Sequence, residues 1–229
     1  MPEASTELRR RAWKALAIYL PAMWLLLFLP AWTLGYWQAW VYWLLYAALS
    51  VAGTRYLLEH DPKLVERRLA VGPGAEREKT QKIIMIFATA CFVLTLAIPG
   101  IDHRLHWSSV PPWLALLGDA GVVLGYACIF AVVRENSYAA ATIRVEAEQP
   151  IISTGPYAIV RHPMYAGALL MLGITPLALG SAWGLLMVLP ILAALAWRLL
   201  DEERFLTRNL PGYADYCRRV RFRLIPGIW

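Results

Sequence analysis

The chain carries little charge for its length. Asp, Glu, Lys and Arg make up 17% of its 229 residues, whereas hydrophobic residues make up 59%. This composition is too apolar for an ordinary soluble domain and is typical of a protein that crosses a membrane several times. The basic residues flank apolar runs and form no basic domain of their own, so nothing in the sequence indicates nucleic-acid binding.

Cysteine is also scarce. An odd count of three, Cys91, Cys128 and Cys217, gives no disulfide framework, and their spacing matches no metal-ligand pattern. Cys91 and Cys128 fall inside apolar segments, where a cysteine is usually a small buried side chain. We therefore expect no metal site and no redox role. The sequence has no internal repeat and no low-complexity segment, which favours one integrated domain.

Long apolar runs are what the chain has in quantity. Residues 12–34, 37–58, 82–98 and 113–133 are close to or above the about 20 residues that a membrane-spanning helix needs. Two shorter runs, 163–179 and 182–200, are joined at Gly180-Ser181 and predict a helical hairpin, which either crosses the bilayer or enters it only in part. Pro99-Gly100 is predicted to end the third span. The prediction is an all-α polytopic membrane bundle of about five to six helices.

In this layout almost all Lys and Arg residues lie on the same side of the membrane. With six spans, all 22 of them except Arg104 lie on the side that holds both termini, the 59–81 loop with its Gly72-Pro73-Gly74 turn, and the 134–162 loop. The positive-inside rule predicts that this side, with both termini and the active site, is cytoplasmic. We expect residues 1–133 to form the amino-terminal membrane helices. Residues 134–229 are expected to form a cofactor-binding loop, the hairpin and a carboxy-terminal cap. The first apolar run is long and no A-x-A site follows it, which indicates a retained helix and not a cleaved signal.

Ionisable residues bracket the last hairpin. It begins with the sequence GPYAIVRHPMYAG, residues 155–167, and ends with Arg198 and the acidic residues 201–203. Ionisable groups at both ends of a short membrane hairpin are costly unless they hold something. Each group also has a simpler interpretation, in which Arg198 snorkels and pairs with Glu202 one helical turn away, while Glu203 is a solvated neighbour.

The start of the hairpin predicts a helix N-terminus. Pro163 suits the first helical position, which places His162 at the N-cap or just outside it, beside free backbone N–H groups that favour an anionic ligand. The alternative is a Tyr–His belt at the membrane interface. The tail, with Tyr213, Tyr216 and several arginines, is either a lid over a cofactor or a basic segment lying on anionic headgroups.

Taken together, these segments resemble a known family. The 155–167 segment, the exit with Arg198, Glu202 and Glu203, and the Tyr-Xaa-Xaa-Tyr-Xaa-Xaa-Arg-Val tail are similar to the isoprenylcysteine carboxyl methyltransferases, which are integral membrane enzymes. The resemblance covers residues 149–229, whereas the first 130 residues match only in hydropathy. The wider group with this carboxy-terminal half includes phospholipid and thiol methyltransferases and, more distantly, NADPH-dependent sterol reductases.

The resemblance implies that S-adenosylmethionine (SAM) binds at the cytoplasmic face. The family's substrate-side arginine falls on Arg198. Gln149 stands where eukaryotic members often have His, and a further family contact between Ile143 and Glu146 cannot be placed. The residues that correspond to the family's cofactor contacts are Gln149, Pro150, Ile151, Ile152, Tyr157, His162, Pro163, Met164, Tyr165 and Glu202.

The predicted function is transfer of a methyl group from SAM to a lipophilic acceptor that enters from the bilayer. The resemblance implies a carboxylate such as an isoprenylcysteine-type group as the preferred acceptor. Such a group is ionised at neutral pH and needs no general base. An amine or thiol acceptor would need a base, for which His162 is the nearest candidate. Phospholipid or thiol methylation, a NADPH-dependent reductase and a non-catalytic membrane protein stay open as alternatives. The cavity is expected between the hairpin and the fourth span, with one entrance from the cytosol and one from the membrane.

Overall fold

The computed structural model describes residues 4–69, 74, 78–139, 142, 145 and 149–229. The predicted turn at Gly72 and Pro73 lies outside these ranges. Two of the basic residues used for the sidedness prediction, Arg77 and Arg144, also lie outside them.

The described chain is helical, and five of its helices are long and apolar enough to cross a membrane. They are α1 (Thr6–Ala31), α2 (Trp37–His60), α4 (Lys79–Leu105), α5 (Pro112–Glu135), and α7 (Val188–Asn209) together with the preceding 3-10 turn η3 (Trp183–Met187). A sixth apolar helix, α6 (Pro163–Ala178), has 16 residues and is therefore about 24 Å long. The prediction of an all-α bundle with five to six membrane helices is confirmed.

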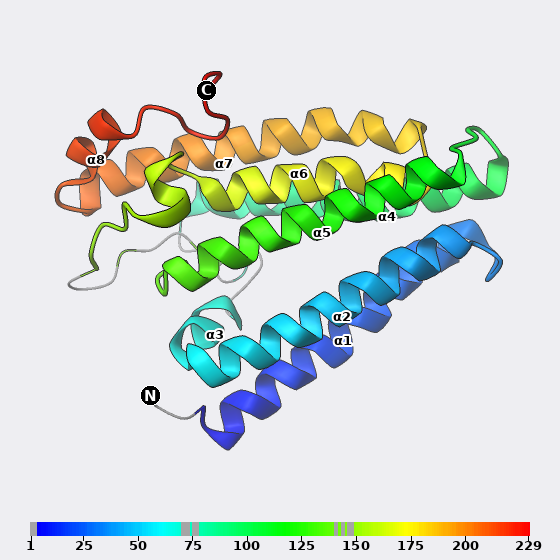
Figure 1. Cartoon of the computed structure of the whole chain (residues 1–229), viewed down its shortest axis with the longest axis horizontal. Coiled ribbons are helices and arrows are strands. Elements are labelled where there is room, and N and C mark those ends of the chain that lie inside the picture. Colours follow the sequence, from blue (N-terminus) through cyan, green and yellow to red (C-terminus); the bar gives the residue numbers. More distant parts are fainter. Residues whose placement is uncertain (1–3, 70–73, 75–77, 140–141, 143–144, 146–148) are drawn as a thin grey trace.

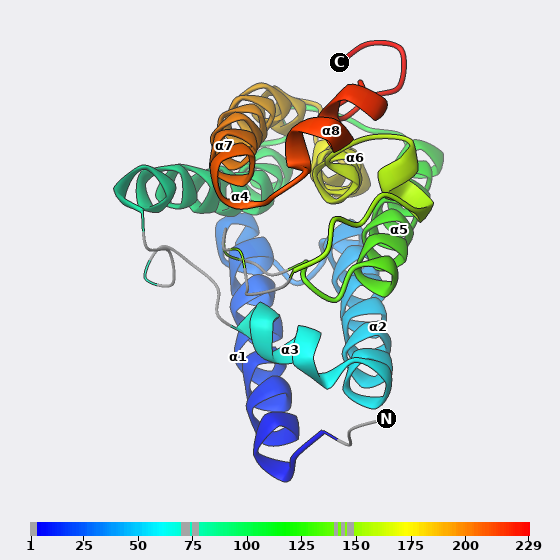
Figure 2. The same cartoon turned by 90° about the vertical axis from the view of Figure 1, so that its left-hand side faces the viewer.

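Three short elements lie toward one end of the bundle (Figures 1 and 2). They are α3 (Pro62–Leu69), the 3-10 turn η2 (Gly155–Ala158) and α8 (Tyr213–Arg219). The sequence analysis did not anticipate α3, although Asp61-Pro62 is a helix-start pattern. The Asp61 carboxylate accepts a hydrogen bond from Leu64 N at 3.0 Å, and Leu64 and Val65 are buried.

Two boundaries differ from the sequence prediction. Helix α4 does not end at Pro99-Gly100 but continues to Leu105, so the predicted stop is wrong. Gly100 lies where α1 crosses α4, and a Cβ there would be 2.8 Å from the Leu27 carbonyl oxygen. The Pro-Gly pair therefore serves close helix packing, because membrane helices tolerate internal proline. Helix α7 continues beyond residue 200, so the charged exit is helical.

Helices α5 and α6 pack backbone to backbone along much of their length. A Cβ on Gly125 would lie 2.7 Å from Met171 Cβ, and one on Gly118 would lie 2.5 Å from Ala178 N. Small residues at such positions let membrane helices approach closely. At these positions α5 and α6 leave no gap between them. The membrane entrance expected beside the hairpin and the fourth span stays a prediction.

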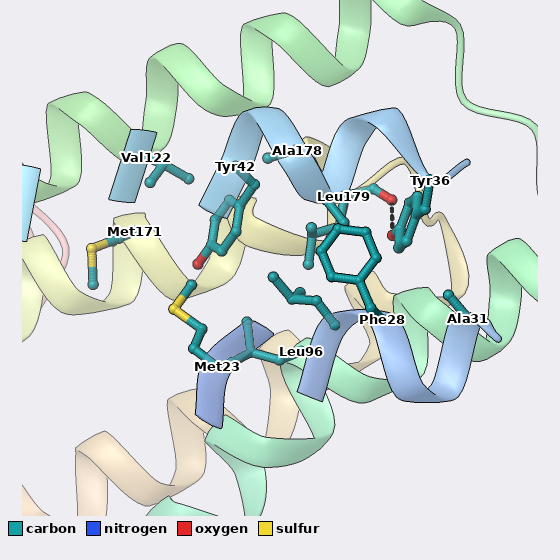
Figure 3. Packing of buried hydrophobic residues seen from close by; sticks show 12 residues of the cluster. Met23, Phe28, Ala31, Tyr36, Tyr42, Leu96, Val122, Met171, Ala178 and Leu179 are labelled. Atoms are coloured by element: carbon teal, nitrogen blue, oxygen red, sulfur yellow. Dashed lines mark hydrogen bonds between the residues drawn. The ribbon is translucent and has the colours of Figure 1, made fainter. Parts of the chain in front are cut away.

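The core fixes the far end of the hairpin (Figure 3). The Tyr36 hydroxyl on α2 donates to the Leu179 carbonyl at 2.5 Å, beside the Gly180 turn, whose φ of +70° suits glycine. Ser181 Oγ donates to Asp102 Oδ2 at 2.5 Å, and Ala182 N donates to Ser108 Oγ at 3.0 Å. The tip of the hairpin therefore lies beside the α4–α5 connection, at the end of the bundle opposite to α3 and α8.

Candidate active site

A hollow opens at the α8 end of the bundle. It is formed by η2, the first turn of α6, one face of α7 and α8, and it holds about 870 Å³ of space with its open mouth included. All ten side chains predicted from the resemblance line it: Gln149, Pro150, Ile151, Ile152, Tyr157, His162, Pro163, Met164, Tyr165 and Glu202. The structure thus brings the predicted residues together, while their binding role stays a prediction.

The start of α6 has the predicted geometry. His162 is the N-cap, Pro163 is the first helical residue, and Met164 and Tyr165 complete the turn that faces the hollow. The backbone at this point is held by the tail, because Arg161 N donates to Phe222 O and His162 N donates to Arg223 O, each at 2.9 Å. The carboxy-terminal segment is therefore hydrogen-bonded directly to the site.

Glu203 organises the charged residues behind the hollow. Its side chain is only 12% exposed, so the prediction of a solvated neighbour is wrong. Glu203 accepts hydrogen bonds from Arg161 Nε at 2.7 Å and from Arg223 Nε at 2.9 Å, and it lies 3.3 Å from His162 Nε2. One carboxylate on α7 thereby joins the start of α6 to the tail, and removing it would leave buried cationic groups uncompensated.

Arg161 binds the tail and does not act as an open anion site. Besides Glu203, its Nη1 donates to the carbonyl oxygens of Val220 at 3.1 Å and Arg221 at 3.3 Å. These bonds hold α8 so that Tyr213 and Tyr216 line the hollow. This placement supports the lid interpretation of the tail over that of a segment lying on headgroups.

A second chain of hydrogen bonds leads from the hollow into the bundle. The Tyr165 hydroxyl donates to Glu202 Oε2 at 2.5 Å and accepts from Arg198 Nε at 3.1 Å. Arg198 Nη1 also donates to Gln81 Oε1 on α4 at 3.2 Å. Arg198 is 8% exposed and does not snorkel, contrary to the simpler interpretation. It contacts the hollow through Tyr165 and is not itself part of the lining.

Tyr157 is held in place from two sides. Asn136 Nδ2 donates to its hydroxyl at 2.9 Å, and the Tyr216 hydroxyl donates to its carbonyl at 2.8 Å. Burial, opposed by the Asn136 hydrogen bond and assisted by the nearby Glu202 charge, raises the pKa of the Tyr157 hydroxyl to about 12. The hydroxyl therefore stays protonated at neutral pH. Since it accepts from Asn136, its hydrogen can be donated into the hollow.

The sequence analysis missed part of the lining. Leu206 on α7 and Leu210 at its C-cap follow Glu202 at intervals of four, a helical spacing that could have revealed them. Asn136 and Tyr138 follow the end of α5 and carry no such signal. The lining residues outside the predicted ten are Asn136, Tyr138, Ala139, Thr142, Arg161, Leu206, Leu210, Tyr213 and Tyr216.

Comparison with known proteins points to the same part of the chain. Residues 113–211 match the family described as PEMT, phospholipid methyltransferase. The cobalt-zinc-cadmium resistance protein CzcN of Cupriavidus metallidurans is 34% identical over 135 residues, which cover 56% of this chain and 56% of that protein. The aligned part is thus about half the length of the curated relative.

These findings support the membrane methyltransferase part of the sequence prediction, whereas the isoprenylcysteine-type acceptor stays a prediction. The matched residues 113–211 run from α5 through the hairpin to the end of α7 and supply most of the hollow's lining. This part of the chain is therefore a domain similar to the phospholipid methyltransferases.

Proposed function

We propose that the protein is a membrane methyltransferase that uses SAM and a lipophilic acceptor, with a carboxylate as the methylated group. The observation that carries the proposal is the convergence of Tyr157, His162, Tyr165 and Glu202 on one hollow. These residues come from three elements, and the methyltransferase-type match covers the same segments.

The hollow's chemistry fits SAM. Glu202 offers a carboxylate to hydroxyl or amino groups, and Tyr157 offers a hydroxyl hydrogen. The Tyr213 hydroxyl is buried and has no hydrogen bond to the described residues, so it has a position open for a ligand acceptor. Aromatic rings from Tyr157, Tyr165 and Tyr213 suit an adenine ring or a sulfonium cation.

The chain's own task would be alignment and exclusion of water. When bound, SAM supplies a methyl group on a sulfonium, and transfer to a carboxylate breaks the C–S bond and forms a C–O bond. Holding two reactants in line lowers a barrier by up to ~7–11 kcal/mol in favourable cases. Arg198, oriented by Tyr165 and Gln81, would orient the acceptor side of the site.

A phospholipid acceptor is the second candidate, favoured by the family match. Methylation of an amine requires loss of a proton. His162 Nε2 already faces Glu203, so only the other ring nitrogen is left to accept such a proton. A carboxylate acceptor, by contrast, needs no base.

Calorimetric titration of the purified protein with SAM and, separately, NADPH tests the cofactor. We expect binding of SAM and none of NADPH, and the reverse would identify a reductase. Labelled SAM added to membrane extracts, followed by lipid chromatography, would identify the acceptor. A base-labile methyl ester is expected for a carboxylate, whereas methylated amine headgroups would favour the phospholipid reaction.

A further inference from the structure

A second hollow lies on the other face of α5. It is formed by α1, α2 and α5, holds about 1140 Å³ of space with its opening included, and is lined mostly by apolar and tyrosine side chains. In Figure 1, α1 and α2 diverge from α5 toward the end that carries α3. We call this hollow the acyl groove, defined by Leu16, Tyr46, Ser50, Tyr126, Ile129 and Phe130.

Arg68, at the end of α3, is the charged residue among the described lining of the acyl groove. Its Nη1 donates to Ala139 O at 3.1 Å and contacts Met164 Sδ at 3.6 Å. Ala139 and Met164 both line the candidate cofactor hollow. The guanidinium therefore sits where the two hollows meet.

Arg68 has no anionic partner in the described part of the chain. The ion pairs there use other arginines, and the groups that face Arg68 electrostatically are the hydroxyls of Tyr46, Tyr126 and Tyr157. Burial lowers the pKa of the guanidinium, because it deprives the charged form of water. A half-buried cation without a counter-ion is costly unless a ligand supplies one.

Tyrosine hydroxyls add polar groups at the same end of the groove. Gly53 lets the Tyr126 hydroxyl approach α2, where it donates to Leu49 O at 2.8 Å. The Tyr19 hydroxyl donates to that of Tyr46 at 3.4 Å. The acyl groove thus combines a mostly apolar and tyrosine lining with a guanidinium at its junction with the cofactor hollow, which matches a chain with one polar head.

Resting on the proposed function, we propose that the acyl groove holds the hydrocarbon chain of the methyl acceptor and that Arg68 selects acceptors with a terminal carboxylate. A guanidinium binds a carboxylate with two parallel hydrogen bonds. This contact places the carboxylate beside Met164, at the wall of the cofactor hollow. The reaction is the transfer already described, and Arg68 acts as a specificity residue.

Photolabelling in nanodiscs of zwitterionic phospholipid tests this assignment. The probes are a photoreactive long-chain fatty acid and its methyl ester, with labelled peptides located by mass spectrometry. We expect acid-selective labelling of α2 and α5 residues in the groove. In Arg68→Gln the apparent affinity for the acid falls about tenfold or more, whereas that for the ester is unchanged. Arg68→Lys retains part of the acid preference.

The control is Arg55→Gln, because Arg55 lies on α2 with a 75% exposed side chain paired to Glu59. It should leave the ratio of acid to ester labelling as in the wild type. Ser50→Phe, which adds bulk inside the groove, should weaken both probes.

An acid-to-ester ratio that Arg68→Gln leaves unchanged would overturn the assignment. Labelling confined to residues outside the groove, or a retained phospholipid there with no fatty-acid labelling, would overturn it as well. SAM titration of the same samples separates the two proposals. Failure of the wild type to bind SAM contradicts the proposed function but leaves an acid-selective groove standing. Normal SAM affinity in Arg68→Gln also shows that this variant is folded.

Discussion

Glu202 and Glu203 are adjacent in the chain but serve different purposes. Glu202 faces the hollow and accepts from Tyr165, whereas Glu203 faces away from it and pairs with three cationic or ionisable side chains. Because consecutive residues on a helix point about 100° apart, one acidic pair can serve a ligand and the scaffold at once.

The Glu202→Gln variant tests the ligand role. In the proposed complex, losing the carboxylate would remove a charge-assisted hydrogen bond to SAM, and such bonds contribute about 1.5–3 kcal/mol. We expect SAM affinity measured by titration calorimetry to fall at least tenfold, while the melting temperature changes little. Glu59→Gln, at an exposed ion pair, is the matched control and should keep wild-type affinity. Unchanged SAM binding in Glu202→Gln would count against the site assignment.

Glu203→Gln tests the scaffold role. Neutralising the carboxylate leaves the Arg161 guanidinium buried beside a group that no longer compensates its charge, at a cost of about 3 kcal/mol. Thermal unfolding in detergent should show a clear loss of stability relative to Glu59→Gln. A melting temperature equal to that of the control would contradict the role of Glu203 as the centre of the charged cluster.

The identity of the site residues could be predicted, but their partners could not. The family resemblance, carried by the 155–167 segment, the exit with Arg198 and Glu202 and the tail, implied ten residues, and all ten line one hollow. The role of Glu203 depends on Arg223, which is distant along the chain and returns only through the fold of the tail. Arg68 was read as one basic residue among many, because nothing local distinguishes a half-buried arginine from an exposed one.

At the level of helices, the α5–α6 contact is the stiffest constraint on the site. Gly125→Ala places a methyl group 2.7 Å from Met171 Cβ and 2.8 Å from Met171 N. Because backbone atoms cannot move aside as a flexible side chain can, we expect a destabilisation of about 1–3 kcal/mol. The measurement is thermal unfolding, with SAM titration to detect displacement of the first turn of α6.

Gly173→Ala on α6 is the control for this prediction. The nearest atom to its added methyl group is Val188 Cγ2 at 4.0 Å, an ordinary contact. Alanine is also the better helix former, so this variant should be neutral or slightly more stable. Equal effects of the two substitutions would show that backbone contact at Gly125 is not what limits the packing.

The positions of the long helices could be predicted from the lengths of the apolar runs, because the hydrocarbon core sets the length that a membrane helix must have. The residues at which these helices end could not be predicted, since tertiary packing overrides local stop signals. Pro99-Gly100 is a stop signal in isolation, yet α1 packs against it and α4 continues. The short helix α3 was missed because it lies inside a polar loop and gains its stability from tertiary packing, in which Val65 joins a cluster with residues of α1 and α2.

For the molecule as a whole, the charge separation and the hairpin depth give one topology. The hairpin tip contacts Asp102 and Ser108 near the α4–α5 connection, which favours a full crossing over a shallow re-entrant loop. We propose six crossings with both ends of the chain and the cofactor hollow on the cytoplasmic side, as the Lys and Arg distribution predicts. At about 24 Å, α6 is shorter than the hydrocarbon core, so its first turn and the hollow would lie at the membrane boundary.

Cysteine labelling tests this topology. In a background with Cys91, Cys128 and Cys217 replaced by alanine, single cysteines are placed at Arg218 and at Trp107, which are both exposed. A membrane-impermeant maleimide should label Arg218→Cys only in inside-out vesicles and Trp107→Cys only in right-side-out vesicles. Ser5→Cys should follow Arg218→Cys, because an even number of crossings puts the two ends of the chain on one side. Labelling of Ser5→Cys and Arg218→Cys from opposite sides would mean an odd number of crossings and would contradict this topology. In that case SAM from the cytosol would reach the hollow only if Arg218 were on the cytoplasmic side and Ser5 on the outer side.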